Sequence, residues 1–333
     1  MKPPSVLPLL LNVLFLWPTC LIAEVKHYKA DICVYGGTAS GVMAVLAAHQ
    51  EGSTVILVEP TRWLGGMTGG GINHLDWGKG ETVGGSTYKI LMDGLKDQKR
   101  AHGGHAKHGI GNKQYRERFK KLVKDRGITV IYDHRVGKVQ VGDEIINKPT
   151  REQPITLGEK IVSKNKNNSI RSIILDYAPV DETGCPIPEP KKRNVITVSA
   201  KVFIDCSYEG DILGMSGVRY TWGRESREHY DESLAGVRPS LWIHDVDPYV
   251  EPGNPKSGLI PFIQDRKIGP LGSADSLSMG YCFRYEFDMS GQGIPIPEST
   301  NYDPAEFEVY RRAIRDGVDI FSSRHMRTTL NKF

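Results

Sequence analysis

The chain has 333 residues, of which 39% are hydrophobic and 25% are charged, and its formal net charge is +4 at pH 7. This is an ordinary globular composition, and the length suits one elaborated domain or two. The charge excess is small and the sequence has no dense basic stretch with interleaved aromatic residues, so composition argues against a nucleic-acid partner.

Residues 1–23 predict a cleaved secretory signal. Lys2 gives a weakly positive start, residues 6–16 form an apolar core, and Ala23 is a small residue at the end of the segment. The apolar core is too short for a comfortable membrane span. We therefore expect an exported protein, periplasmic or secreted, with no stable membrane span after cleavage. An uncleaved anchor is the alternative.

Residues 30–59 predict two parallel strands joined by a helix. Residues 30–35 are apolar and rich in β-formers, residues 42–50 carry apolar side chains at helical spacing, and residues 54–59 form a second apolar strand that ends on Glu59. A glycine turn joins the first strand to the helix. This order is a βαβ unit that opens a parallel sheet.

The glycine turn of this unit has the chemistry of a dinucleotide site. Gly36 lets the chain turn sharply, the next glycine position lets backbone approach a pyrophosphate, and Gly41 lets the helix pack tightly on the strand. The N–H groups of the helix start then hold the phosphates. Glu59 ends the second strand, where its carboxylate accepts hydrogen bonds from ribose hydroxyls. Thr38 stands where the fingerprint has its second glycine, and Gly37 is the neighbour that shares this role. A purely structural βα turn is the alternative.

A long glycine-rich loop, residues 60–76, follows the second strand. A nicotinamide-binding domain usually proceeds quickly to its next helix, so the loop implies a second close approach of backbone to a ligand. The chain resembles a family of FAD-dependent oxidoreductases with a glutathione-reductase-like fold, found mainly in bacteria. The motifs that carry the resemblance are Tyr35-Gly-Gly-Thr-x-x-Gly41, Glu59-Pro and Leu64-Gly-Gly-Met67-Thr.

The resemblance implies an α/β fold, with a Rossmann-like FAD-binding domain built on a parallel sheet and a β-rich substrate or cap domain. It implies FAD as the cofactor and hydride transfer between the flavin and an unidentified small-molecule substrate. The cofactor-binding residues expected on this basis are Gly36, Gly37, Thr38, Gly41, Glu59, Arg62, Gly65, Gly66, Met67, Val136 and Asp205.

Further elements follow in order. Residues 113–126 predict an amphipathic helix and residues 128–132 a strand. In the resembling fold, backbone near Val136 touches the adenine. An apolar strand then ends at Asp205 and returns to the parallel sheet beside the cofactor, although a core strand with a solvated acidic turn is the alternative.

The sequence therefore divides into five segments. We expect a signal at 1–23, the first part of the FAD-binding domain at 28–140, an antiparallel β segment at 141–198, the return strand at 199–216 and the substrate or cap domain at 217–333.

Three side chains are weak candidates for catalysis. His74 ends the glycine-rich loop near the expected flavin ring, as a proton shuttle or flavin contact. Arg224 and Arg284 are candidates to bind a carboxylate or another anion. The alternatives are a structural histidine and arginines held in salt bridges.

No metal site is expected. Histidines at 102, 105 and 108 have a spacing that a helix would align as ligands, but the glycines between them favour a solvated loop.

Two other functions stay open. Members of the resembling family are longer than this chain, and a C-terminal segment completes their flavin site. We therefore expect a C-terminally truncated chain, and the alternative function is an exported, non-catalytic or degenerate fragment that has lost flavin binding. A nicotinamide-dependent dehydrogenase is a third possibility, which the loop at 62–71 and the strand ending at Asp205 argue against. The sequence does not indicate the oligomeric state.

Overall fold

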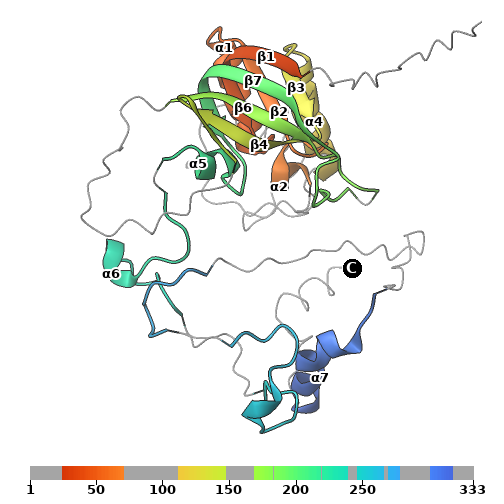
Figure 1. The fold of residues 1–333 in the computed structure, drawn as a ribbon, viewed down its shortest axis with the longest axis vertical. Helices are drawn as coiled ribbons and strands as arrows, with labels where there is room; N and C mark the ends of the chain where they lie inside the picture. Colours follow the sequence, from red (N-terminus) through yellow and green to blue (C-terminus); the bar gives the residue numbers. More distant parts are fainter. Residues whose placement is uncertain are drawn as a thin grey trace, which may run out of the picture. The chain divides into compact units, whose positions relative to one another are not determined.

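The computed structural model describes eight stretches of the chain, and these belong to two compact units (Figure 1). The first unit lies within residues 1–217 and the second is formed mainly by residues 218–333. Residues 1–23, for which a signal is predicted, lie outside the described residues. The described stretches are 25–70, 112–147, 169–182, 184–218, 220–238, 246–265, 269–277 and 301–317.

A seven-stranded sheet, in the order β3-β2-β1-β7-β6-β4-β5, forms the centre of the first unit. Strands β3, β2, β1 and β7 are parallel neighbours, whereas β6 pairs antiparallel with β7 and β4, and β5 pairs antiparallel with β4. The α/β class with a parallel sheet is thereby confirmed. The strands are β1 (Lys26–Tyr35), β2 (Val55–Glu59), β3 (Thr129–Tyr132), β4 (His134–Val141), β5 (Glu144–Ile146), β6 (Ile170–Tyr177) and β7 (Lys192–Asp205).

Four helices of the described residues accompany this sheet. α1 (Ala39–Gln50) connects β1 to β2, and α4 (Asn112–Lys124) precedes β3. The short α2 (Gly66–Gly69) and α5 (Asp211–Met215) follow β2 and β7, and Figure 1 shows both at one end of the sheet. The predicted amphipathic helix is confirmed, since α4 buries one side. Its buried residues are Tyr115, Phe119 and Val123.

Strand β7 differs from the sequence expectation. The sequence predicts an antiparallel segment that ends at 198 and a separate return strand after it, whereas the structure has a single strand of 14 residues. Apolar and polar residues alternate from Ile196 to Val202, and the segment contains neither glycine nor proline, so nothing in it ends the extended backbone. One edge of β7 pairs with β1 and the other with β6, so the strand belongs to both the parallel and the antiparallel part of the sheet.

The hydrophobic core lies between the two parts of this sheet and α5. Each buried aliphatic side chain contributes about 1.5–3 kcal/mol relative to exposure. The core gives the strand ends a rigid support. Its members are Ala30, Cys33, Tyr35, Ile56, Val58, Ile131, Val139, Val141, Ile173, Leu175, Ile196, Val198, Ile212 and Met215.

The described part of the second unit is made of short helices and loops. Its elements are α6 (Arg227–Tyr230), η2 (Pro255–Ser257), η3 (Pro304–Phe307) and α7 (Glu308–Arg315). Two isolated β-bridges, Arg224 with Asp275 and Tyr249 with Leu259, occur within the same described ranges. No helix among the described residues of either unit is long and apolar enough to cross a membrane.

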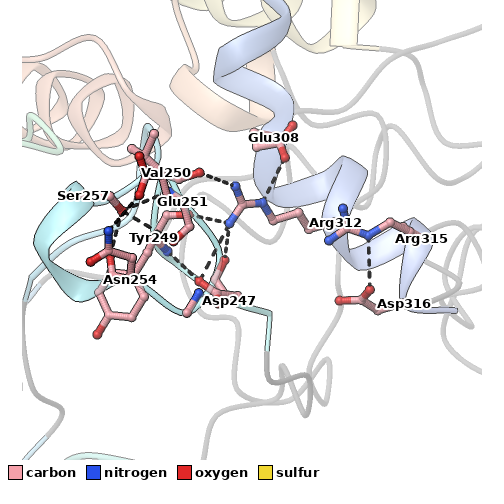
Figure 2. A network of polar contacts seen from close by, with 11 residues as sticks. Asp247, Tyr249, Val250, Glu251, Asn254, Ser257, Glu308, Arg312, Arg315 and Asp316 are labelled. Atoms are coloured by element: carbon pink, nitrogen blue, oxygen red, sulfur yellow. Dashed lines mark hydrogen bonds and ion pairs between the residues drawn. The ribbon is translucent and has the colours of Figure 1, made fainter.

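A buried arginine organises the loop that η2 belongs to (Figure 2). The Arg312 side chain, only 5% exposed, donates to the carbonyl oxygens of Asp247 at 2.8 Å, Tyr249 at 2.6 Å and Val250 at 3.1 Å. Its Nε also donates to Glu308 Oε1 at 2.9 Å. The planar guanidinium presents five donors in fixed directions, so one side chain satisfies several inward-facing carbonyls at once.

Candidate functional site

Three loops meet where the neighbouring strands β2, β1 and β7 end. The amide of Gly65 donates to the Gly37 carbonyl at 2.7 Å, and the Thr38 hydroxyl donates to the Cys206 carbonyl at 2.9 Å. The Met67 amide donates to the Tyr208 hydroxyl at 2.8 Å. In open α/β sheets, ligands bind outside the carboxyl ends of the strands. These mutual hydrogen bonds make the three loops one candidate site.

Two glycines of the first loop are required for different reasons. Gly36 has φ +92, and a Cβ there would lie 2.6 Å from the backbone nitrogen of Ser207. A Cβ on Gly41 would lie 1.9 Å from the Gly36 carbonyl oxygen. Gly36 needs the left-handed conformation. Both positions need a residue without a side chain, because neighbouring backbone atoms occupy the space that a Cβ would take.

Thr38 stands at the position of the second glycine of the dinucleotide fingerprint, and here it caps a helix. It is the N-cap of α1, and its hydroxyl accepts the Gly41 amide at 3.2 Å. The same hydroxyl reaches Cys206, so the residue ties the start of α1 to the end of β7. The neighbouring Gly37 also has no room for a side chain, because a Cβ there would lie 2.6 Å from Leu64 Cδ2 and 2.8 Å from Glu59 Oε2.

The Glu59 carboxylate is buried beside the turn, with 6% of the residue exposed. Its Oε2 accepts the Gly37 amide at 2.6 Å, and its Oε1 accepts the amide and the hydroxyl of Thr61 at 2.7 and 2.6 Å. Burial raises the pKa of Glu59, while these hydrogen bonds act in the opposite direction. A carboxylate accepts about four hydrogen bonds. Three protein donors therefore leave roughly one acceptor position for a ligand hydroxyl.

Two expected cofactor contacts have protein partners at the β3–β4 corner. Arg62 Nε donates to both carboxylate oxygens of Asp133, at 3.0 and 3.1 Å. The Val136 amide donates to the Tyr35 hydroxyl at 3.2 Å. Their role toward a cofactor stays a prediction.

Asp205 shapes the loop that follows β7. Its Oδ1 accepts the amide and hydroxyl of Ser207 at 3.0 and 2.7 Å. Its Oδ2 accepts the amides of Ile212 and Leu213 at 2.8 and 2.9 Å, which are otherwise unsatisfied donors of the first turn of α5. All of these contacts are local to the loop, and a direct contact with the cofactor remains a prediction.

Sequence reasoning missed a buried pair behind the site. The Tyr35 side chain is fully buried, and its hydroxyl donates to Asp211 Oδ2 at 3.0 Å while accepting the Val136 amide. Burial raises the pKa of Tyr35 and also that of Asp211. One hydroxyl therefore joins the ends of β1 and β4 to the start of α5. A tyrosine immediately before the glycine turn was the only local signal for this contact.

Replacing Tyr35 with phenylalanine is expected to lower the free energy of unfolding by about 1–3 kcal/mol, because the Val136 amide and the Asp211 carboxyl lose their partner away from water. Urea unfolding measures the change. Tyr28→Phe is the matched control, since Tyr28 is a half-buried tyrosine of the same strand. Equal midpoints for the two variants would show that the Tyr35 hydroxyl stabilises nothing.

The catalytic candidates are only partly described. Arg224 belongs to the second unit and forms a forked ion pair with Asp275, with Nε 2.9 Å from Oδ1. This is the salt-bridge arrangement that the sequence left as an alternative. His74 and Arg284 lie outside the described residues, as do the three histidines at 102, 105 and 108. In the stretches that the structure describes, no group of three or more histidine, cysteine or acidic residues is arranged to hold a metal.

Comparison with known proteins gives one family. A family model described as FAD dependent oxidoreductase matches residues 31–159 and 187–332, which is most of the chain. None of the curated proteins matches.

Solved structures resemble the chain only distantly. L-proline dehydrogenase from P. horikoshii is 13% identical, with 61% of this chain and 24% of that chain covered and a TM-score of 0.28. A geranylgeranyl bacteriochlorophyll reductase-like protein from Thermoplasma acidophilum is 13% identical, with 56% and 41% covered and a TM-score of 0.32. Thermovibrio ammonificans THI4 is 13% identical, with 57% and 86% covered and a TM-score of 0.30. The chain thus spans less than half the length of the first two.

Proposed function

Since this chain belongs to the family of FAD dependent oxidoreductases, and its cofactor is FAD, we propose that it is an enzyme that transfers hydride between a small-molecule substrate and the flavin. The observation that carries the proposal is the meeting of a glycine turn and a buried carboxylate at the carboxyl edge of the sheet. Gly37 joins them directly, because its amide donates to Glu59.

The residues of the site fit the cofactor. A pyrophosphate needs backbone without side chains at the start of a helix. Gly36 and Gly41 match the first and third glycines of such a site, which allow the tight turn and the close helix packing, because a Cβ at either position would collide with backbone atoms. A ribose needs a fixed acceptor, and Glu59 is a buried carboxylate with an acceptor position left. We propose that the turn holds the pyrophosphate and that Glu59 holds the ribose.

The protein supplies binding and electrostatics in such an enzyme, and the bound flavin supplies the acceptor of the hydride. The positive end of the α1 dipole favours the charge of the phosphates. Thr38 caps this helix through its hydroxyl and leaves the remaining first-turn amides to a ligand. The substrate is a small molecule whose identity the described residues do not indicate.

The absorption spectrum of the purified protein tests this proposal. We expect a flavin spectrum that stays with the protein through desalting, or that appears after FAD is added, and that bleaches under anaerobic conditions when a substrate reduces the flavin. A colourless protein that also ignores added FAD would support the alternative, in which flavin binding has been lost. Binding of a reduced nicotinamide dinucleotide in place of FAD would support the dehydrogenase alternative.

A further inference from the structure

Thr61 contacts the Glu59 carboxylate more extensively than any other described residue. Its amide and hydroxyl both donate to Oε1, at 2.7 and 2.6 Å. The hydroxyl also accepts the Trp63 amide at 3.1 Å, and the Thr61 carbonyl accepts the Asp133 amide at 3.2 Å. The residue is therefore fixed by the chain on both sides, and it presents its two donors to one carboxylate oxygen.

Hydrogen bonds alone compensate the Glu59 charge among the described residues. The nearby Arg62 is directed to Asp133 instead, because its Nε donates to both oxygens of that carboxylate. Glu209, in the loop after β7, adds a like charge that raises the pKa of Glu59 further. Tyr132, the neighbour of Glu59 in β3, is neutral, because burial and the Glu59 charge raise its own pKa. Two of the three hydrogen bonds that oppose these effects come from Thr61.

We propose that Thr61 is a positioning residue for the cofactor, whose hydroxyl holds the Glu59 carboxylate in the orientation that binds the ribose of the dinucleotide. Gly37 fixes Oε2 and Thr61 fixes Oε1, so the carboxylate cannot rotate away from the turn without breaking hydrogen bonds. The proposal rests on the function proposed above, since it requires that Glu59 accepts a ribose hydroxyl.

The sign of the pH dependence follows from the acceptor role. Ionised Glu59 accepts the ribose hydroxyl well, so affinity is full above the pKa of Glu59 and falls as the pH drops through it. The Thr61 hydrogen bonds lower this pKa, and removing the hydroxyl therefore raises it. Without the hydroxyl, the acid loss of affinity begins at a higher pH.

Calorimetric titration of the full chain with ADP, which carries the ribose and both phosphates, tests the proposal between pH 5 and 9. We expect Thr61→Val to bind ADP about tenfold more weakly at pH 7, as the loss of one hydrogen bond to a charged group predicts. The loss of ADP affinity at acid pH also begins at a higher pH in Thr61→Val. Thr61→Ser keeps the hydroxyl and should therefore have the affinity and the pH profile of the wild type.

Thr54→Val is the matched control. The Thr54 hydroxyl donates to Asp31 Oδ2 at 2.6 Å, a threonine–carboxylate contact between the start of β2 and the middle of β1, away from the glycine turn, so this variant should bind ADP as the wild type does. Equal affinity and equal pH profiles for Thr61→Val and Thr54→Val would overturn the proposed role of Thr61 and leave the proposed function unaffected. A wild-type protein that binds neither ADP nor FAD would instead overturn the proposed function, and this inference with it.

Discussion

Replacing Gly36 with alanine is expected to abolish flavin retention and to lower the free energy of unfolding by about 4 kcal/mol. The left-handed conformation at φ +92 costs an alanine about 1–2 kcal/mol. The larger cost is steric, because the new Cβ would lie 2.6 Å from the Ser207 nitrogen and 2.7 Å from the Cys206 carbonyl carbon. Asp205 holds that loop through four hydrogen bonds, so the loop cannot retreat cheaply.

Gly52→Ala is the matched control for this prediction. Gly52 also has a positive φ, +82, but an added Cβ would meet nothing within 4 Å. It should cost only the conformational strain, about 1 kcal/mol, and leave the flavin in place. Urea unfolding and the flavin absorbance after desalting measure both variants. If Gly36→Ala behaves like Gly52→Ala, the close approach of backbone at the turn plays no part in stability or binding.

Arg312→Met is expected to unfold the loop at 247–258 in the second unit, with a loss of about 3–5 kcal/mol in local stability. Methionine retains helix propensity and most of the length of arginine, but it donates no hydrogen bond. Three carbonyl oxygens and Glu308 then lose their donor in a site where the arginine is only 5% exposed. A carbonyl left without a donor beside a buried side chain costs about 1–3 kcal/mol, so the three carbonyls account for a loss of this size.

Arg311→Met provides the comparison on the same helix. The Arg311 side chain is 66% exposed, and its contact with Glu308 is 3.5 Å long, so its removal should change stability by less than about 1 kcal/mol. Hydrogen exchange of the Tyr249, Val250 and Gly253 amides reports on the loop, because these amides are hydrogen-bonded within it. Unchanged protection in Arg312→Met would show that the loop holds its shape without the guanidinium.

The local sequence pattern predicted those elements of the first unit that depend on contacts between residues close in the sequence. The βαβ unit from β1 to β2 and the buried side of α4 follow from periodicity, since Tyr115, Phe119 and Val123 recur on one side of the helix. The glycine turn was predictable for the same reason, because its fingerprint lies within a few residues. The continuity of β7 was not, because strand length depends on partners at both edges rather than on the strand itself.

Contacts between residues far apart in the sequence could not be predicted from local pattern. Tyr35 meets Asp211 across 176 residues, and no periodicity in either segment requires that meeting. The cofactor role of Arg62 stays a prediction, but its contact with Asp133 was not predictable from the sequence, because it depends on the β3–β4 corner lying next to the end of β2. An arginine has several acceptors within reach, and only the assembled sheet decides among them.

The position of β7 has a consequence for the order in which the chain assembles on the ribosome. Strands β1, β2 and β3 are complete once residue 132 has emerged, but the second edge of β1 is paired only when residues 196–205 arrive. At about 5–20 residues per second, the hydrogen-bonding groups of a central strand stay unpaired for roughly 4–15 s. An open edge of this kind is a template for wrong pairing. We therefore expect nascent chains that stop before β7 to depend on chaperones, and a chain that includes β7 to be released from them.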